Sequence, residues 1–212
     1  MSLRQQKKAR ARRDILTVAS TLINTLGYER AKMRDIAAAA EISYQTLYNY
    51  FPTKALILQA ILTEDVTHTS NEIEALIDRY DGDLLATLDG VTRLRLDVIS
   101  HHDRHLWRIV VIDRFGEQPE PGNVYQLIAE AAHRVLEALF NTAQVAGDLD
   151  AEIDTRLLTD TVFALNQQAT TTYIMEPNMP RQATEDHLRE QYALLIGPYL
   201  INRKPAPLQS DP

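Results

Sequence analysis

Apolar residues recur at helical spacing along most of this chain, and no other feature limits its fold as strongly. The first clear example is the set Ile15, Leu16, Ala19, Leu22, Ile23 and Leu26. This spacing places all six side chains on one face of an α-helix. No segment alternates apolar and polar residues in the way that a half-buried β-strand does. The pattern therefore predicts an all-α protein.

Local signals divide the first third of the chain into four helices. Gly27 follows the first apolar stripe and is typical of a helix C-terminus. An alanine-rich segment at 33–40 and the segment 44–51 predict two short helices, the second of which ends before Pro52. Thr53 is then placed to cap a long fourth helix.

Later breaks predict further helices in the remaining two thirds. We expect interruptions at the stretches YDGD (80–83), HHDRH (101–105), GEQPEPG (116–122) and EPNMP (176–180), and near Gly147. We expect Asp154 and Thr184 to cap the last two long helices.

Charge is distributed unevenly. The chain has a formal net charge of −7, yet residues 1–54 contain ten Lys or Arg and only four Asp or Glu. A basic segment on an acidic body indicates a polyanionic partner for that segment, although a solvated basic tail is the alternative. The absence of cysteine excludes disulfides, thiolate metal sites and a cysteine nucleophile. We find neither a transmembrane run nor the apolar core of a secretory signal.

Residues 36–50 predict two short helices joined by a turn. Ala37 is small enough for two crossing helices to approach closely, and Ala40, Ile42, Leu47 and Tyr50 could share the same core. The second helix would then expose Ser43, Tyr44, Gln45, Thr46 and Asn49. None of these is acidic, and all can bond to base edges or phosphates.

The stretch GYERAKMRDIAAAAEISYQTLYNYFPTKALIL resembles the DNA-binding domain of the tetracycline-repressor (TetR) family of bacterial regulators. The matching elements are Gly27, Asp35-Ile36-Ala37, Ala40, Ile42-Ser43, Thr46-Leu47-Tyr48, Tyr50-Phe51 and Lys54. The rest of the chain is similar to the family in length, helix count and loop placement. The resemblance implies a homodimeric helix-turn-helix regulator of the bacterial cytoplasm, most often a repressor, that binds a palindromic double-stranded operator.

The resemblance also implies which residues contact DNA. Tyr44, Gln45 and Thr46 would lie in the major groove, Tyr48 and Tyr50 would reach phosphates, and the first arginines would form an N-terminal arm. The full set expected at DNA is Arg12, Arg13, Lys32, Arg34, Ser43, Tyr44, Gln45, Thr46, Tyr48, Asn49, Tyr50 and Lys54.

Two positions depart from the family pattern. Lys32 stands where the family usually has Thr or Ser, so it cannot cap the second helix with a side-chain oxygen. Glu41 stands where the family usually has Gly, at a turn position that often needs a positive φ.

The resemblance implies that the chain after residue 54 binds an effector and dimerises through its last two long helices. The interface set is Leu158, Val162, Leu165, Leu188, Tyr192, Leu195 and Tyr199, for which the alternative is core packing within one chain. A pocket for a small, largely hydrophobic effector would include Trp107, Val111, Asn166 and Thr170. Core packing is again the alternative for Trp107, the single tryptophan.

We therefore expect a DNA-binding domain at 1–54, a helical effector and dimerisation domain at 55–204, and a disordered tail at 205–212. His101 and His105 stand four residues apart, but a polar helix junction is favoured over a metal site. No catalytic motif is present, and no cofactor is expected. The alternative function is a ligand-independent DNA-binding adaptor whose helical body binds another protein.

Overall fold

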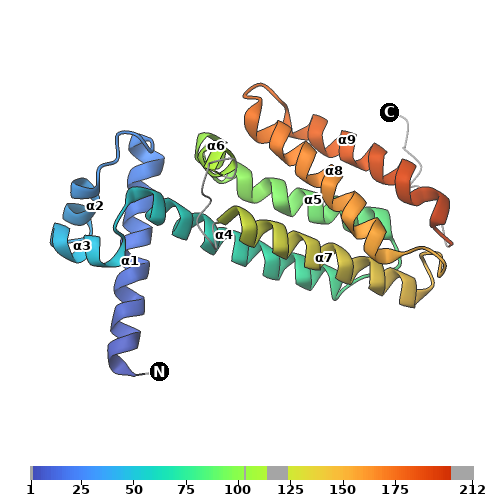
Figure 1. The fold of residues 1–212 in the computed structure, drawn as a ribbon, viewed down its shortest axis with the longest axis horizontal. Coiled ribbons are helices and arrows are strands. Elements are labelled where there is room, and N and C mark those ends of the chain that lie inside the picture. Colours follow the sequence, from blue (N-terminus) through green and yellow to red (C-terminus); the bar gives the residue numbers. More distant parts are fainter. Residues whose placement is uncertain (1, 103, 114–123, 202–212) are drawn as a thin grey trace, which may run out of the picture. The chain divides into compact units, whose positions relative to one another are not determined.

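The computed structural model describes residues 2–102, 104–113 and 124–201 (Figure 1). Within these ranges the elements are α1 (Leu3–Leu26), α2 (Met33–Ala39), α3 (Tyr44–Tyr50), α4 (Lys54–Ile77), α5 (Leu84–Ser100), α6 (Arg104–Asp113), α7 (Val124–Ala146), α8 (Thr155–Met175), α9 (Arg181–Ile196) and a short 3₁₀ helix, η1 (Gly197–Tyr199). This confirms the all-α fold. The predicted loop at 116–122 and the tail at 205–212 lie outside the described residues.

The chain forms two compact units. The first contains residues 1–67 and 101–127, and the second contains residues 68–100 and 128–212. The predicted domain boundary between residues 54 and 55 falls inside the first unit, at the start of α4. Among the helices of the described segments, none is long and apolar enough to cross a membrane.

Three of the predicted helix ends are confirmed. Gly27 ends α1 with φ 83°, and its N–H donates to the Ile23 carbonyl. The Thr53 hydroxyl accepts from the Leu56 N–H at 3.2 Å, at the start of α4. Asp154 caps α8 by accepting from two backbone N–H groups.

The predicted start of the last helix is wrong. α9 begins at Arg181 after Pro180, so Thr184 lies inside the helix rather than at its cap. Pro180 provides an extended residue at the start of the helix, with φ −68°, and needs no side-chain cap to do so. Thr184 is buried, and its hydroxyl donates back to the Pro180 carbonyl at 3.5 Å.

The N-terminal helices of the first unit are built around a small apolar core. The buried side chains come from α1, α2, α3 and the start of α4: Ile15, Leu16, Ala19, Ile23, Ile36, Ala37, Leu47, Phe51, Ile57 and Leu58. α2 packs against both α1 and α3. Ala37 and Leu47 are buried as predicted, whereas Ala40, Ile42 and Tyr50 are only half-buried.

The turn between α2 and α3 has the backbone geometry that the sequence indicates. Glu41 has φ 55°, the left-handed region that favours glycine. The Ile42 N–H donates to the Ala37 carbonyl at 3.0 Å, which closes the turn. At the other end of α2, Lys32 occupies the N-cap and makes no side-chain cap bond, also as predicted.

The second unit packs α9 against both α5 and α8 (Figure 1). A buried polar network joins the three helices. The Tyr192 hydroxyl on α9 donates to the Asn166 Oδ1 on α8 at 2.9 Å and lies 3.0 Å from the Thr92 hydroxyl on α5. Burial raises the pKa of the Tyr192 phenol, so this hydroxyl stays protonated and able to donate.

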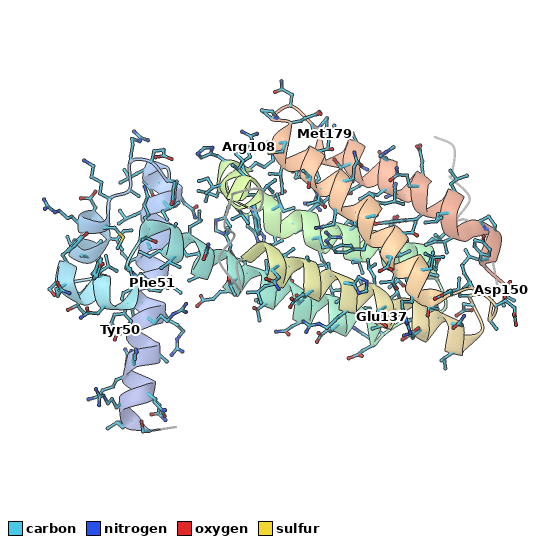
Figure 2. All side chains as sticks on the ribbon, viewed as in Figure 1. Tyr50, Phe51, Arg108, Glu137, Asp150 and Met179 are labelled. Carbon is cyan, nitrogen blue, oxygen red and sulfur yellow. The ribbon has the colours of Figure 1, made fainter. Side chains whose placement is uncertain are left out.

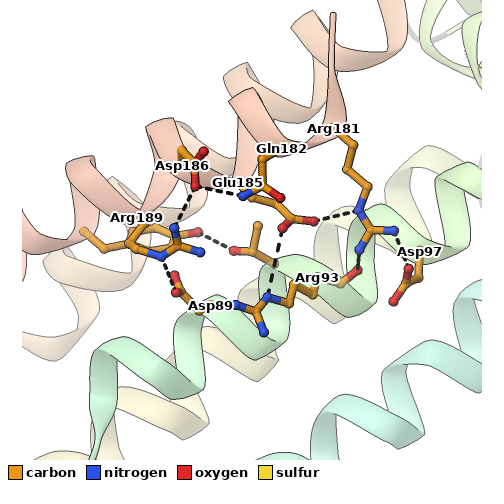
Figure 3. A network of polar contacts seen from close by, with 10 residues as sticks. Asp89, Arg93, Asp97, Arg181, Gln182, Glu185, Asp186 and Arg189 are labelled. Carbon is orange, nitrogen blue, oxygen red and sulfur yellow. Dashed lines mark hydrogen bonds and ion pairs between the residues drawn. The ribbon is translucent and has the colours of Figure 1, made fainter. Parts of the chain in front are cut away.

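Ion pairs hold α5 and α9 together outside this core (Figure 3). Arg189 pairs with Asp89 at 2.5 Å and with Asp186 at 2.7 Å. Arg181 pairs with Asp97 and also with Glu185, the latter at 2.6 Å. Glu185 is buried, and a buried carboxylate without a partner is costly, so its pair with Arg181 is more important for stability than an exposed ion pair would be.

Replacing Tyr192 with Phe should destabilise the protein by about 1–3 kcal/mol, because it leaves buried groups of Asn166 and Thr92 without their partner. Urea unfolding at fixed protein concentration measures the free energy of unfolding. Tyr48→Phe is the matched control, since Tyr48 is 48% exposed, lies outside the second unit and should tolerate the change. Equal losses in the two variants would contradict the role of the buried network.

Replacing Glu41 with Gly should stabilise the DNA-binding region by up to about 1 kcal/mol. A non-glycine residue in the left-handed region costs about 1–2 kcal/mol, which exceeds the extra backbone entropy of glycine, about 0.5–1 kcal/mol. Glu41→Gln is the control, because it removes the charge and keeps the Cβ atom. A gain from Glu41→Gln as large as that from Glu41→Gly would assign the effect to charge rather than to backbone strain.

Candidate nucleic-acid interface

Helix α3 buries one side chain and exposes most of the others. Leu47 is fully buried against the core, which turns the opposite face of the helix toward solvent. That face contains Ser43, Tyr44, Gln45, Thr46, Tyr48 and Asn49, all of which are exposed. Tyr50 is half-buried at the end of the helix, next to the buried Phe51 (Figure 2). None of the six exposed residues is charged, and most of them can donate or accept hydrogen bonds.

The exposed polar residues of α3 are already organised by hydrogen bonds. The Ser43 hydroxyl accepts from the Thr46 N–H at 3.0 Å and lies 2.7 Å from the Thr46 hydroxyl. Ser43 therefore caps α3, a structural role that its position before an amphipathic segment could have indicated. A second bond joins two residues that are one turn apart: the Gln45 Nε2 donates to the Asn49 Oδ1 at 3.2 Å.

The basic N-terminal residues belong to a helix rather than to an extended arm. α1 begins at Leu3, so Arg12 and Arg13 are placed by helical geometry. Arg12 pairs with Glu64 at 3.5 Å and stacks over the Phe51 ring at 5.1 Å. The segment expected to form the N-terminal arm is thus helical, because a continuous helix and a capping box at Ser2 order it.

The Lys54 side chain is held in place by Tyr28. Its Nζ donates to the Tyr28 carbonyl at 2.5 Å and lies 4.1 Å from the centroid of the Tyr28 ring. Burial, and to a lesser degree Glu29, raises the pKa of the Tyr28 phenol, so the ring is neutral. A lysine ammonium has three N–H donors, so two remain for another acceptor. Two further cations, Lys32 and Arg34, are exposed at the start of α2.

The junction between α5 and α6 makes contacts that sequence reasoning did not identify. His102 approaches Asp65 on α4, with 2.6 Å between Nε2 and Oδ2, and Asn24 on α1, with 3.4 Å between Nδ1 and Oδ1. The three residues are too far apart in sequence for any local pattern to pair them. In the described parts of the chain, no group of His, Cys, Asp and Glu side chains could hold a metal ion.

The four residues expected at an effector are divided between the two units. Trp107 and Val111 are buried on α6 in the first unit, whereas Asn166 and Thr170 lie on α8 in the second. Among the described residues, none accepts a hydrogen bond from the Trp107 indole N–H. Asn166 is instead part of the core network, because its Nδ2 donates to the Val162 carbonyl and its Oδ1 accepts from Tyr192.

The residues expected at a dimer interface fall into two groups. Leu158, Val162, Leu188 and Tyr192 are buried by their own chain and belong to the core cluster of the second unit. The interface prediction needs correction for these four, because their faces of α8 and α9 point into the protomer. Leu165 and Leu195 are half-buried and Tyr199 is exposed. The same helices also expose Leu157 and Leu194. The apolar pattern of the sequence did not indicate that Leu194 would be exposed.

Residues 15–61 match the family model described as bacterial regulatory proteins, tetR family. The chain is 29% identical over 166 residues to the HTH-type transcriptional repressor KstR2 of Rhodococcus jostii (strain RHA1), covering 74% of this chain and 78% of the relative.

Solved structures share the fold. FadR of Thermus thermophilus, in complex with lauroyl-CoA, superposes with a TM-score of 0.66 at 19% identity, covering 92% of this chain and 98% of FadR. FadR of Bacillus subtilis, in complex with stearoyl-CoA, gives 0.61 at 21% identity, covering 86% and 96%. Regulators of the tetR family are DNA-binding transcription factors rather than enzymes. Residues 15–61 thus match the model of the tetR family of bacterial regulatory proteins, and the whole chain is similar to a transcriptional repressor and to solved regulators with the same all-helical fold.

Proposed function

We propose that this protein is a dimeric repressor that binds a palindromic operator and is released by a small, largely hydrophobic effector. The observation behind the DNA-binding surface is α3, which with its N-cap Ser43 exposes six neutral polar or aromatic residues and no acidic one. Such a helix can enter the major groove without repulsion from phosphates. We expect the protein to act in the bacterial cytoplasm, where it reaches the chromosome.

Cations placed around α3 would anchor the protein to the DNA backbone. Arg12, Arg13, Lys32, Arg34 and Lys54 come from α1, from the start of α2 and from the start of α4. Lys54 has two spare N–H donors for a phosphate, and its contact with Tyr28 limits the rotamers it must give up. Backbone contacts of this kind set register and affinity, whereas α3 would supply sequence preference.

The dimer would form through the exposed sides of α8 and α9. These helices are antiparallel and joined by residues 176–180, so the start of α8 and the end of α9 lie at the same end of the pair (Figure 1). Leu157 is 65% exposed, Leu194 is 80% exposed and Tyr199 is 44% exposed there. Exposed apolar residues that gather in this way are typical of a protein interface. Half-buried Leu165 and Leu195 would complete the contact.

The effector part of the proposal is supported by the buried indole N–H of Trp107, which has no partner among the described residues. Trp107 is 3% exposed, and Leu106, Val110 and Val111 on the same helix are also buried. A buried N–H without a partner costs free energy, which a ligand with an acceptor oxygen would recover. A thioester carbonyl with an acyl chain combines such an acceptor with apolar surface. FadR of Thermus thermophilus is bound to lauroyl-CoA, whose acyl chain is hydrophobic although its coenzyme A part is charged. We therefore propose acyl-CoA thioesters first, with the acyl chain as the part that enters the apolar site beside Trp107.

Replacing Leu194 with Asp should convert the dimer to monomers and weaken operator binding, because a dimer needs both half-sites and an interface buries the new charge. Light scattering measures the mass, and a gel-shift titration measures operator affinity. Val145→Asp is the control, since Val145 is 90% exposed on α7, outside the proposed interface. A dimeric, fully active Leu194→Asp variant would remove α9 from the interface.

Lauroyl-CoA should release the operator and change the fluorescence of Trp107 over one concentration range, whereas coenzyme A alone should do neither. The chain has a single tryptophan, so the emission reports on this site alone. Trp107→Phe removes the N–H and should raise the concentration needed for release by roughly tenfold, as expected for one lost hydrogen bond. Release with unchanged emission and a normal Trp107→Phe response would place the effector elsewhere. A protein that no acyl-CoA releases would favour the adaptor function.

A further inference from the structure

The hydrogen bonds of α3 separate its exposed polar residues into two kinds. Ser43 and Thr46 are bonded to each other and to the first turn of the helix, so their hydroxyls stabilise its start. Gln45, between Ser43 and Thr46, and Asn49, one turn later, take no part in this cap, and their side chains bond to each other. The second pair is therefore the one whose amide groups are available for bases.

The Gln45–Asn49 bond leaves a defined set of donors and acceptors. Gln45 uses one Nε2 hydrogen, so its Oε1 acceptor and its second hydrogen stay available. Asn49 uses an Oδ1 lone pair and keeps both Nδ2 hydrogens. Both side chains are exposed, and the bond restricts how each amide can rotate. The pair thus presents donors beside an acceptor in a partly fixed arrangement.

This arrangement matches one base better than the others. In the major groove adenine presents an acceptor, N7, beside a donor, N6, which a carboxamide complements. Guanine presents two acceptors, which arginine or lysine reads best, and α3 (YQTLYNY) contains neither. The exposed rings of Tyr44 and Tyr48 offer apolar surface for a thymine methyl group.

We propose that Gln45 and Asn49 act as one hydrogen-bonded unit that selects an A·T base pair in each operator half-site. The inference rests on the proposed function, in which α3 enters the major groove. Because the two amides hold each other, removal of either one frees the other to rotate. The preference of the unit therefore depends on both residues together rather than on the sum of two separate contacts.

Selection from a randomised double-stranded DNA library tests this with the full-length protein. The wild type should enrich a palindrome with a fixed A·T pair in each half. Gln45→Ala and Asn49→Ala should each lower the preference at that same position by about 5-fold to 100-fold. The double variant should lose no more than the larger single loss. Lys32→Ala is the control and should weaken binding to all sequences alike.

The outcomes separate this inference from the function on which it rests. If the wild type enriches no palindrome, the proposed operator recognition itself is wrong. If the wild type enriches a palindrome but both alanine variants keep its A·T preference, only the reading unit is wrong. Losses at two different base positions that add in the double variant would also overturn the unit. Circular dichroism of each variant confirms that α3 is still folded, since alanine favours a helix.

Discussion

The burial of Leu47 is the interaction on which the proposed DNA-binding surface depends. α2 and α3 have seven residues each, far fewer than the roughly 12–15 that an isolated helix needs to be stable in water. Leu47 is 0% exposed, and α2, which packs against α3, buries Ile36 and Ala37, so tertiary contact supplies the stability that the short helices lack. It also orients α3, because a helix with one face buried must expose the opposite face. Ser43 then fixes where that face begins.

Aromatic rings give the basic side chains fixed positions around this helix. Lys54 rests on Tyr28, and Arg12 rests on Phe51, which is itself part of the core. Each cation gains about 0.5–1 kcal/mol from such a contact at an exposed site. The larger effect is to limit the conformations that the long side chains must lose on binding a phosphate. The same core therefore supports both the reading helix and the cations beside it.

The second unit separates polar groups that serve the protomer from apolar groups that remain available. The Thr92–Tyr192–Asn166 network and the paired Glu185 join α5, α8 and α9 through buried polar groups. Because unpaired polar groups in a core are costly, this network also fixes the register of the three helices. With that register set, Leu157 and Leu194 can only point outward.

Sequence periodicity and turn chemistry determined a large share of this protein. The helical stripes, Gly27, Thr53 and Asp154 predicted the all-α fold and three helix ends, because these signals act within one or two turns. The positive φ of Glu41 and the missing cap at Lys32 were predicted in the same way. The exposed set on α3 followed from its neutral composition and the single buried leucine.

Only the tertiary structure decided what the long helices bury. The apolar stripes of α8 and α9 contained Val162, Leu188 and Tyr192, but a stripe records that a face is covered and not which chain covers it. For the same reason Asn166 could be placed in the core only once Tyr192 was seen to bond to it. The contact of His102 with Asp65 and Asn24, and the stacking of Arg12 on Phe51, join residues distant in sequence. Such pairs follow from how the helices pack, which no local pattern determines.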